Sequence, residues 1–324
     1  MKKRVIITGS AGFIGFHTSL EFLNNGYKVL GIDNINKYYD VNIKLERNKI
    51  LKKFKNFKFK KIDLSKLNNK SNSLQKFQPD IVIHLAAQAG VRYSLEAPEE
   101  YINSNIIATF NILETFKNTK LKHLMVASTS SVYGLNKKFP FKESDKTDTP
   151  ISIYAATKKS VENICHAYSY NFKMPITALR FFTVYGPWGR PDMALFKFVK
   201  NTLKNKPIDV FNYGKMKRDF TYVKDVSRSL FLLKNKPPSK KQNNYQVLNI
   251  GNQNIVLLNK FILTIEKILG LKAKKKYLPM QMGDVKQTLS NTKKLKKLIN
   301  FSPSTRIEVG IQNFIKWYKD YFNQ

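Results

Sequence analysis

The chain has 324 residues, of which 42% are hydrophobic, and its 57 Lys and Arg against 22 Asp and Glu give a net charge of +35. This composition excludes a disordered chain, and the length allows one large α/β unit or two domains that share a cleft. The single cysteine, Cys165, excludes an intramolecular disulfide and fits a reducing compartment. No stretch approaches the roughly 20 apolar residues of a membrane span, so we expect a cytoplasmic protein without a membrane partner.

The strong positive charge is the first feature that needs an interpretation, because it would suit a nucleic-acid partner. The lysines are spread over every segment, and runs such as 274–276 accompany no recognisable RNA- or DNA-binding module. We therefore interpret the charge as a solvated surface and expect no nucleic-acid partner.

Residues 4–8 predict a short buried strand, and the glycine-rich turn 9–15 leads from it directly into a helix. Gly9 allows the sharp turn, Gly12 lets a pyrophosphate approach the backbone amides, and Gly15 lets the helix pack close to the strand. The helix N-terminus offers free N–H groups and a positive dipole end. The residues expected at the cofactor are Gly9, Gly12, Phe13, Ile14 and Gly15. Any tight strand-to-helix turn favours glycine, so this turn alone is a weak signal.

An acidic residue strengthens the dinucleotide hypothesis. A second predicted strand over 27–32 is followed by Asp33, eighteen positions beyond Gly15. A carboxylate at this point can accept both ribose hydroxyls of an adenosine and would repel a 2′-phosphate, so it favours NAD over NADP. We expect Asp33 and Asn34 in the cofactor site.

Strand and helix signals alternate through the first half of the chain, which predicts a doubly wound parallel sheet. Further strands are expected over 57–62, 80–85 and 123–127, and one continuous helix over 98–117 with an apolar stripe. Strand ends of such a sheet line the ligand crevice. The residues expected there are Asp63, Leu64, Ala86 and Ala87. The stripe of the helix is formed by Tyr101, Ile106, Phe110 and Leu113.

Four consecutive hydroxyl residues, 128–131, follow the fifth strand. They are poor packing material, so they either form a turn rich in Ser and Thr or hydrogen-bond a polar ligand at the crevice. Tyr154 and Lys158 then stand four apart on a predicted helix, which places them on one face with Cβ atoms about 5–6 Å apart. A free tyrosine has a pKa of about 10, and a neighbouring ammonium together with a positive nicotinamide ring can lower it.

With these motifs in this order, the sequence from Lys3 to about Tyr321 resembles the extended short-chain dehydrogenase/reductase superfamily, specifically its NAD-dependent nucleotide-sugar epimerases and dehydratases. The resemblance implies a Rossmann fold with a smaller mixed α/β substrate domain, divided into residues 1–185 for NAD and 186–324 for the nucleotide sugar, with room for an interleaved boundary. It implies that Tyr154, Lys158 and Thr129 are catalytic. A homodimer through the two long helices 98–117 and 153–172 is expected by analogy.

Within that family, Arg-Pro-Asp-Met at 190–193 resembles the UDP-glucuronate 4-epimerases rather than the galactose enzymes. Because an arginine fork matches a carboxylate, Arg190 is our candidate near the sugar acid, with a plain surface arginine as the alternative. The resemblance implies that Arg218 meets the UDP diphosphate and Asp284 the uridine ribose. The residues expected to bind the substrate are Ser130, Ser131, Thr183, Arg190, Arg218 and Asp284.

The implied reaction is NAD-dependent C4 epimerisation of UDP-glucuronate to UDP-galacturonate through a transient 4-keto intermediate. Tyr154 as phenolate would take the C4 hydroxyl proton while hydride leaves C4 for NAD, and Thr129 would share a hydrogen bond to that oxygen. Related decarboxylases carry a glutamate where Ser131 stands, and dehydratases carry Asp-Glu where Ser130-Ser131 stand, so hydroxyls here favour an epimerase.

Two alternatives remain open at this point. The first is a 4-epimerase of another UDP-hexose, such as UDP-GlcNAc or UDP-glucose. The second is a non-catalytic basic Rossmann protein that binds nucleic acid, which the presence of Tyr154, Lys158 and Thr129 argues against. No metal-ligand set is assigned.

Overall fold

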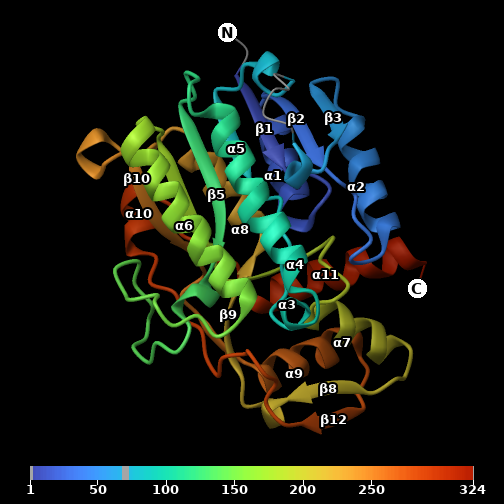
Figure 1. Cartoon of the computed structure of the whole chain (residues 1–324). Helices are drawn as coiled ribbons and strands as arrows, with labels where there is room; N and C mark the ends of the chain where they lie inside the picture. The colour runs from blue at the N-terminus through green and yellow to red at the C-terminus, as the bar shows by residue number, and fades with distance from the viewer. Residues whose placement is uncertain (1–2, 68–72, 324) are drawn as a thin grey trace.

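The computed structural model describes residues 3–67 and 73–323 (Figure 1). Its largest element is a seven-stranded sheet in the order β10-β6-β5-β4-β1-β2-β3, with every neighbouring pair parallel. The strands are β1 (Arg4–Thr8), β2 (Lys28–Asp33), β3 (Phe57–Lys61), β4 (Ile81–His84), β5 (His123–Thr129), β6 (Ile176–Phe181) and β10 (Tyr245–Ile250). The predicted doubly wound parallel sheet is confirmed.

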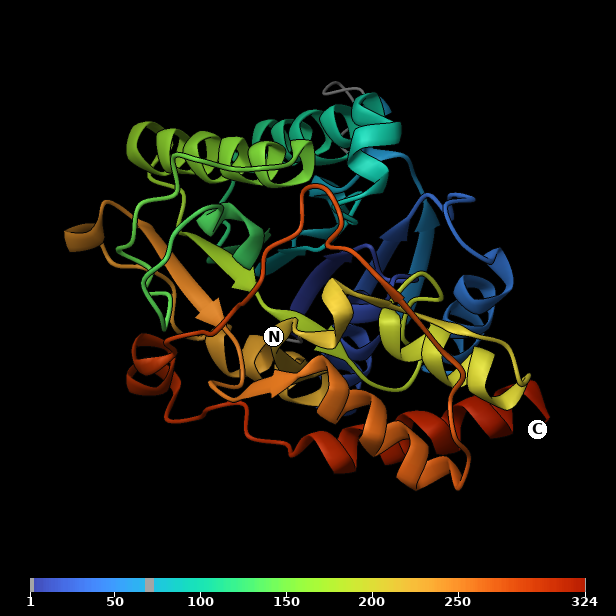
Figure 2. The ribbon, with the colours of Figure 1, turned by 90° about the horizontal axis from the view of Figure 1, so that it is seen from below.

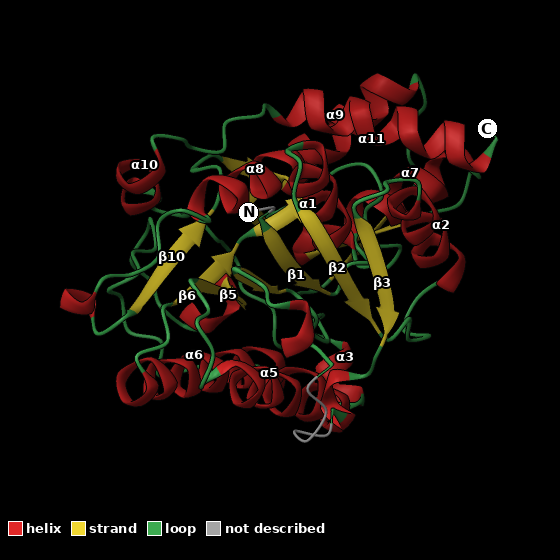
Figure 3. Ribbon diagram, turned by 90° about the horizontal axis from the view of Figure 1, so that it is seen from above, coloured by secondary structure: helices red, strands yellow, loops and turns green. Residues whose placement is uncertain are grey.

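Helices cover both faces of this sheet, as Figure 3 shows. One face carries α5 (Ala108–Phe116) and α6 (Ile153–Phe172), and the other carries α1 (Phe13–Asn24) and α8 (Val223–Leu233). Each side has its own apolar cluster, because the strands are buried on both faces and alternate side chains point to opposite helix layers. The remaining helices beside the sheet are α2 (Val41–Lys52), α3 (Tyr93–Glu96), α4 (Pro98–Tyr101) and α10 (Lys293–Ile299).

A smaller region is built from a three-stranded and a two-stranded sheet with three helices. Its strands are β7 (Thr183–Tyr185), β9 (Lys217–Tyr222), β11 (Ile255–Leu257), β8 (Ile208–Phe211) and β12 (Lys275–Leu278), and its helices are α7 (Ala194–Leu203), α9 (Leu258–Leu269) and α11 (Ile307–Phe322). Figure 2 shows two helices of this region, the orange α9 and the red α11, side by side along the lower edge of the view. The apolar face of α11 packs into a separate core cluster. Among the residues described, no helix combines the length and the apolar character that crossing a membrane requires.

The second half of the chain returns to the large sheet. β10 pairs with β6 as an edge strand, α8 packs against α1, and α10 contacts β10. The chain therefore passes between the two regions more than once, which is an interleaved arrangement. The division into a cofactor domain and a substrate domain remains a proposal.

The helix predicted over about 98–117 is present over 98–116, but it contains a π-helical segment that was not predicted. The π-helical segment Ile102–Ile107 separates α4 from α5. A π turn takes more residues than an α turn, so it changes the face on which later residues lie. Of the expected stripe, Tyr101 and Leu113 are fully buried, whereas Phe110 is 39% exposed.

Candidate functional site

A cleft of about 690 Å³ opens at the carboxyl ends of the strands of the large sheet, where the smaller region faces them. The strand order reverses between β1 and β4, and ligands of open α/β sheets bind outside such a switch point. Every site residue predicted from the sequence lines this one cleft: Gly9, Gly12, Phe13, Ile14, Gly15, Asp33, Asn34, Asp63, Leu64, Ala86, Ala87, Thr129, Ser130, Ser131, Tyr154, Lys158, Thr183, Arg190, Arg218 and Asp284.

The glycine turn is shaped as a cradle without side chains. Gly9 has a φ of +67°, and a Cβ there would lie 2.8 Å from the backbone nitrogen of Ala86. A Cβ on Gly15 would lie 1.9 Å from the carbonyl oxygen of Gly9, so the helix packs closely against the turn that follows β1. α1 begins at Phe13 with Gly12 as its N-cap and no side-chain cap. The turn thus leaves space and backbone N–H groups for the phosphates of a dinucleotide.

Asp33 lies at the end of β2 with its carboxylate already oriented. Its oxygens accept the backbone N–H of Ala11 at 3.1 Å and of Ile35 at 2.8 Å. Burial raises the pKa of this carboxyl, and these N–H groups together with the charges of Lys44 and Arg47 oppose the rise. A carboxylate fixed in this way beside the glycine turn fits the ribose of a bound dinucleotide.

The floor of the cleft holds the predicted catalytic groups. α6 begins after Ser152, whose hydroxyl caps the helix by accepting the N–H of Ala155. The first turn then carries Tyr154 and the second carries Lys158, whose Nζ donates to the carbonyl oxygen of Ala127 at 2.9 Å. Burial lowers the pKa of Lys158 to about 8.

The phenol of Tyr154 is set by different neighbours from those that the sequence suggested. Burial raises its pKa, whereas a hydrogen bond with Thr129 and the charge of Arg190 lower it. The expected partner, Lys158, turns to Ala127 instead. The net shift of the Tyr154 pKa is upward, because burial outweighs the hydrogen bond and the arginine charge.

All four hydroxyl residues line the cleft, but their side chains make different hydrogen bonds. Thr129 donates to the hydroxyl of Ser131 at 3.2 Å and accepts the Ser131 N–H, also at 3.2 Å. Ser128 instead donates to Glu162 at 2.6 Å, within the buried layer between β5 and α6. Alternation along a strand explains this difference. Thr129, Ser130 and Ser131 face the cleft together with Thr183, the first residue of β7.

At the mouth of the cleft, two arginines are already paired with carboxylates. Arg190 forms a fork with Asp192, at 3.0 Å and 2.5 Å, and also donates to the carbonyl oxygen of Ala89 at 2.9 Å. Arg218 donates to Asp284 at 2.7 Å, so two residues predicted to bind different parts of the substrate contact each other. Each guanidinium carries five N–H donors, so an anionic ligand can bind beside the carboxylate or replace it.

Sequence reasoning missed several lining residues. They include Tyr38, whose hydroxyl donates to Asp192 at 3.2 Å, and Gln88. Gln88 is held by Asn105, which accepts its N–H and donates to its carbonyl oxygen. No sequence signal marks Asn105, because it lies in the unexpected π-helical segment.

Within residues 3–67 and 73–323, no three His, Cys, Asp or Glu side chains are grouped to hold a metal ion.

Comparisons with known proteins agree with this geometry. A model of the NAD dependent epimerase/dehydratase family matches residues 5–251. The UDP-glucuronate 4-epimerase of Thermodesulfobacterium geofontis (strain OPF15) is 42% identical over 316 residues, covering 97% of this chain and 96% of that protein. The crystal structure of UDP-glucuronic acid 4-epimerase from Bacillus cereus, in complex with UDP-glucuronic acid and NAD, is 36% identical with a TM-score of 0.91, covering 98% of this chain and 99% of that one.

A neighbour with another substrate has the same fold. UDP-N-acetylglucosamine 4-epimerase from Methanobrevibacter ruminantium M1, in complex with UDP-N-acetylmuramic acid, is 29% identical with a TM-score of 0.87, covering 99% of this chain and 100% of that one. The family match spans both the glycine turn and the helix of Tyr154, and the curated relative extends the similarity over nearly the whole chain. This chain belongs to the NAD dependent epimerase/dehydratase family.

Proposed function

We propose that this protein catalyses the NAD-dependent C4 epimerisation of UDP-glucuronate to UDP-galacturonate. The observation that carries the proposal is the set of hydroxyl groups beside Tyr154: Thr129, Ser130, Ser131 and Thr183 all line the cleft. Hydroxyls can hold a sugar carboxylate, but they supply no carboxyl acid or base for elimination at positions 130 and 131. The similarity to UDP-glucuronate 4-epimerases over nearly the whole chain supports the same activity.

In the proposed reaction Tyr154 acts as the base. As phenolate it takes the proton of the C4 hydroxyl, with Thr129 hydrogen-bonded to the same oxygen. NAD held by the glycine turn and Asp33 would supply the hydride acceptor and donor at C4, and inversion requires that the 4-keto sugar turn over in the cleft between the two transfers. The ammonium of Lys158 adds positive charge beneath the site, where it is fixed by Ala127.

The cofactor and the substrate would occupy different parts of the cleft. The glycine turn and Asp33 would hold the dinucleotide, with Asn34, Asp63, Leu64, Ala86 and Ala87 lining the same part of the cleft. Arg218 is proposed for the diphosphate and Asp284 for the uridine ribose, and their mutual hydrogen bond holds the two side chains next to each other. Arg190 is proposed near the sugar acid, where the uronate carboxylate would replace Asp192 on its fork.

We also propose that two copies associate through the layer of α5 and α6. Large apolar side chains are exposed on this layer, and exposed apolar patches mark interaction surfaces. They are Ile102, Ile107, Phe110, Ile153 and Phe172. Sedimentation of the purified protein would give the mass of a dimer; a monomer at micromolar concentration would contradict the proposal.

The activity is tested by incubating the purified protein with UDP-glucuronate and following the products by NMR. A mixture of the two uronates without pentose would establish the epimerase. Turnover of UDP-GlcNAc or UDP-glucose without turnover of UDP-glucuronate would overturn the uronate assignment and leave the role of Tyr154 intact. Release of a UDP-pentose would identify a decarboxylase instead.

A further inference from the structure

Successive turns of α6 are attached to consecutive residues at the end of β5. Lys158 donates to the carbonyl oxygen of Ala127, and one turn later Glu162 accepts the hydroxyl of Ser128 at 2.6 Å. Tyr154, Lys158 and Glu162 are spaced by four residues, so they share one face of the helix. Glu162 is therefore the inner member of the row that carries the proposed base and its lysine, although it does not reach the cleft.

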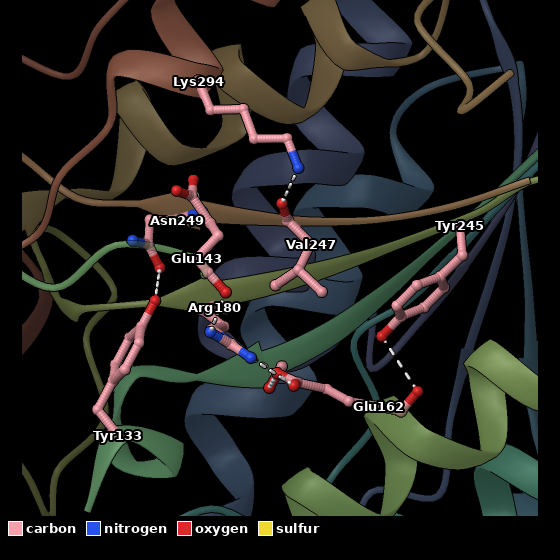
Figure 4. A network of polar contacts seen from close by, with 9 residues as sticks. Tyr133, Glu143, Glu162, Arg180, Tyr245, Val247, Asn249 and Lys294 are labelled. Carbon is pink, nitrogen blue, oxygen red and sulfur yellow. Dashed lines mark hydrogen bonds and ion pairs between the residues drawn. The ribbon is translucent and has the colours of Figure 1, made fainter. Parts of the chain in front are cut away.

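Glu162 is fixed by three strands of the large sheet. Arg180 of β6 donates to both of its carboxylate oxygens, from Nε at 2.9 Å and from a terminal nitrogen at 2.8 Å, and the two side chains are only 4% and 3% exposed. The backbone carbonyl of Glu162 accepts the hydroxyl of Tyr245 on β10 at 3.0 Å. The guanidinium also lies 4.8 Å from the ring centre of Tyr133. Figure 4 shows this network around Arg180 and Glu162.

We propose that Glu162 is a positioning residue of the reaction, which fixes α6 on the carboxyl ends of β5 and β6 and holds the ammonium of Lys158 charged beneath the cleft. The expected effect of Glu162 on turnover rests on the proposed function. The expected effect of Glu162 on the charge of Lys158 rests only on the dinucleotide site.

The groups around Lys158 differ in their charge and therefore in their effect on the pKa of Lys158. Burial lowers the pKa of Lys158 to about 8, and the groups that oppose this are Cys165 and Glu162, both on α6. Burial raises the pKa of the Cys165 thiol to about 12, so the thiol is uncharged near neutral pH. His84 of β4 faces Lys158, but burial and the Lys158 charge lower its pKa to about 3, so it is neutral as well. Arg180 of β6 forms an ion pair with Glu162, which offsets part of the carboxylate charge. Of the two groups that oppose the fall in the Lys158 pKa, Glu162 is the charged one, so its carboxylate favours the protonated lysine.

The test is Glu162→Gln, which keeps the shape and removes the charge. NAD affinity is measured by titration calorimetry at several pH values on the full chain freed of dinucleotide. We expect the wild-type affinity to fall above the pH at which Lys158 loses its proton. In the variant this pH should be lower by about one unit. Lys158→Met should abolish this pH dependence, and this loss would identify Lys158 as the group that titrates. In the NMR assay, kcat should fall about tenfold or more, with KM little changed, and the alkaline limb of kcat should move in the same direction.

The matched control is Glu114→Gln. Glu114 also ties α6 to its neighbour, through the hydroxyl of Tyr168 at 2.5 Å, but far from Lys158 along the helix. This variant should keep the wild-type pH profile. If Glu162→Gln fails to fold, the double variant Glu162→Gln, Arg180→Met replaces the pair by neutral side chains of similar length. A smaller shift in the same direction is then expected, because the Arg180 charge is removed together with the Glu162 charge.

An unchanged pH dependence of NAD affinity and an unchanged kcat in a folded Glu162 variant would overturn the inference. Because the NAD titration does not involve a sugar, its result stands even when UDP-glucuronate is not turned over. An inactive wild type with a normal titration counts against the proposed function, and an active wild type with an unshifted variant counts against Glu162.

Discussion

Arginine–carboxylate ion pairs lie both beneath the floor of the cleft and at its mouth, but they differ in burial. Beneath the floor, Arg180 and Glu162 are 4% and 3% exposed and make a complete fork. At the mouth, Arg190 and Asp192 are 18% and 28% exposed, and Arg218 and Asp284 are 16% and 33% exposed. A buried charge left without its partner is costly, whereas a pair that keeps some contact with solvent costs less to separate. The difference in exposure predicts that the Arg180–Glu162 pair stabilises the fold more than the two pairs at the mouth, whose arginines are proposed to bind the substrate.

The strongest test of the floor is Tyr154→Phe, which removes only the hydroxyl. We expect kcat to fall by about 10²- to 10⁴-fold, because the proton acceptor is lost, while the chain keeps its stability. The NMR assay measures turnover, and calorimetric titration with UDP-glucuronate checks that binding survives. Near-normal turnover would show that another group accepts the proton.

The floor and the mouth should differ most sharply in stability. Arg180→Met leaves Glu162 buried without its cation and should lower the free energy of unfolding by about 3–5 kcal/mol. Arg190→Met, at a pair whose side chains are 18% and 28% exposed, should lower it less, by about 1–2 kcal/mol, because solvent screens this pair in part. Urea unfolding followed by circular dichroism measures both. Equal losses would remove the distinction between the two kinds of pair.

At the mouth, Arg218→Lys tests the proposed contact with a diphosphate. A lysine keeps the charge but loses the planar fork, so we expect KM for the UDP-sugar to rise about tenfold with kcat nearly unchanged. Steady-state kinetics over a range of substrate concentration gives the two constants. A loss confined to kcat would place Arg218 in the chemistry rather than in binding.

The smallest effect is expected from Asp192→Asn, which removes the competitor for Arg190. If the sugar carboxylate replaces Asp192, KM for UDP-glucuronate should fall by about two- to fivefold, and KM for UDP-glucose should not change. Parallel kinetics with the two substrates makes the comparison. A rise in KM for the uronate would instead mean that Asp192 orients Arg190 for binding.

Local sequence signals predicted the parts of the site that depend on neighbours along the chain. The glycine turn needs particular backbone geometry within seven residues, and the helix of Tyr154 and Lys158 is marked by its period. The pairing of Arg218 with Asp284 joins residues 66 positions apart, so no local pattern contains it. The π-helical segment has no apolar period of its own, and it was missed for that reason. Ser128 could have been separated from Thr129 by strand alternation alone.

The return of β10 to the large sheet has a consequence for how the protein is made. While a ribosome is still adding residues, β6 is the edge of the sheet and exposes a row of unpaired N–H and C=O groups until β10, Tyr245–Ile250, arrives to pair with it. Exposed edges of this kind invite aggregation of nascent chains. The large sheet is therefore complete only after β10 has been synthesised, and we expect a chain that ends before Tyr245 to leave the β6 edge unpaired.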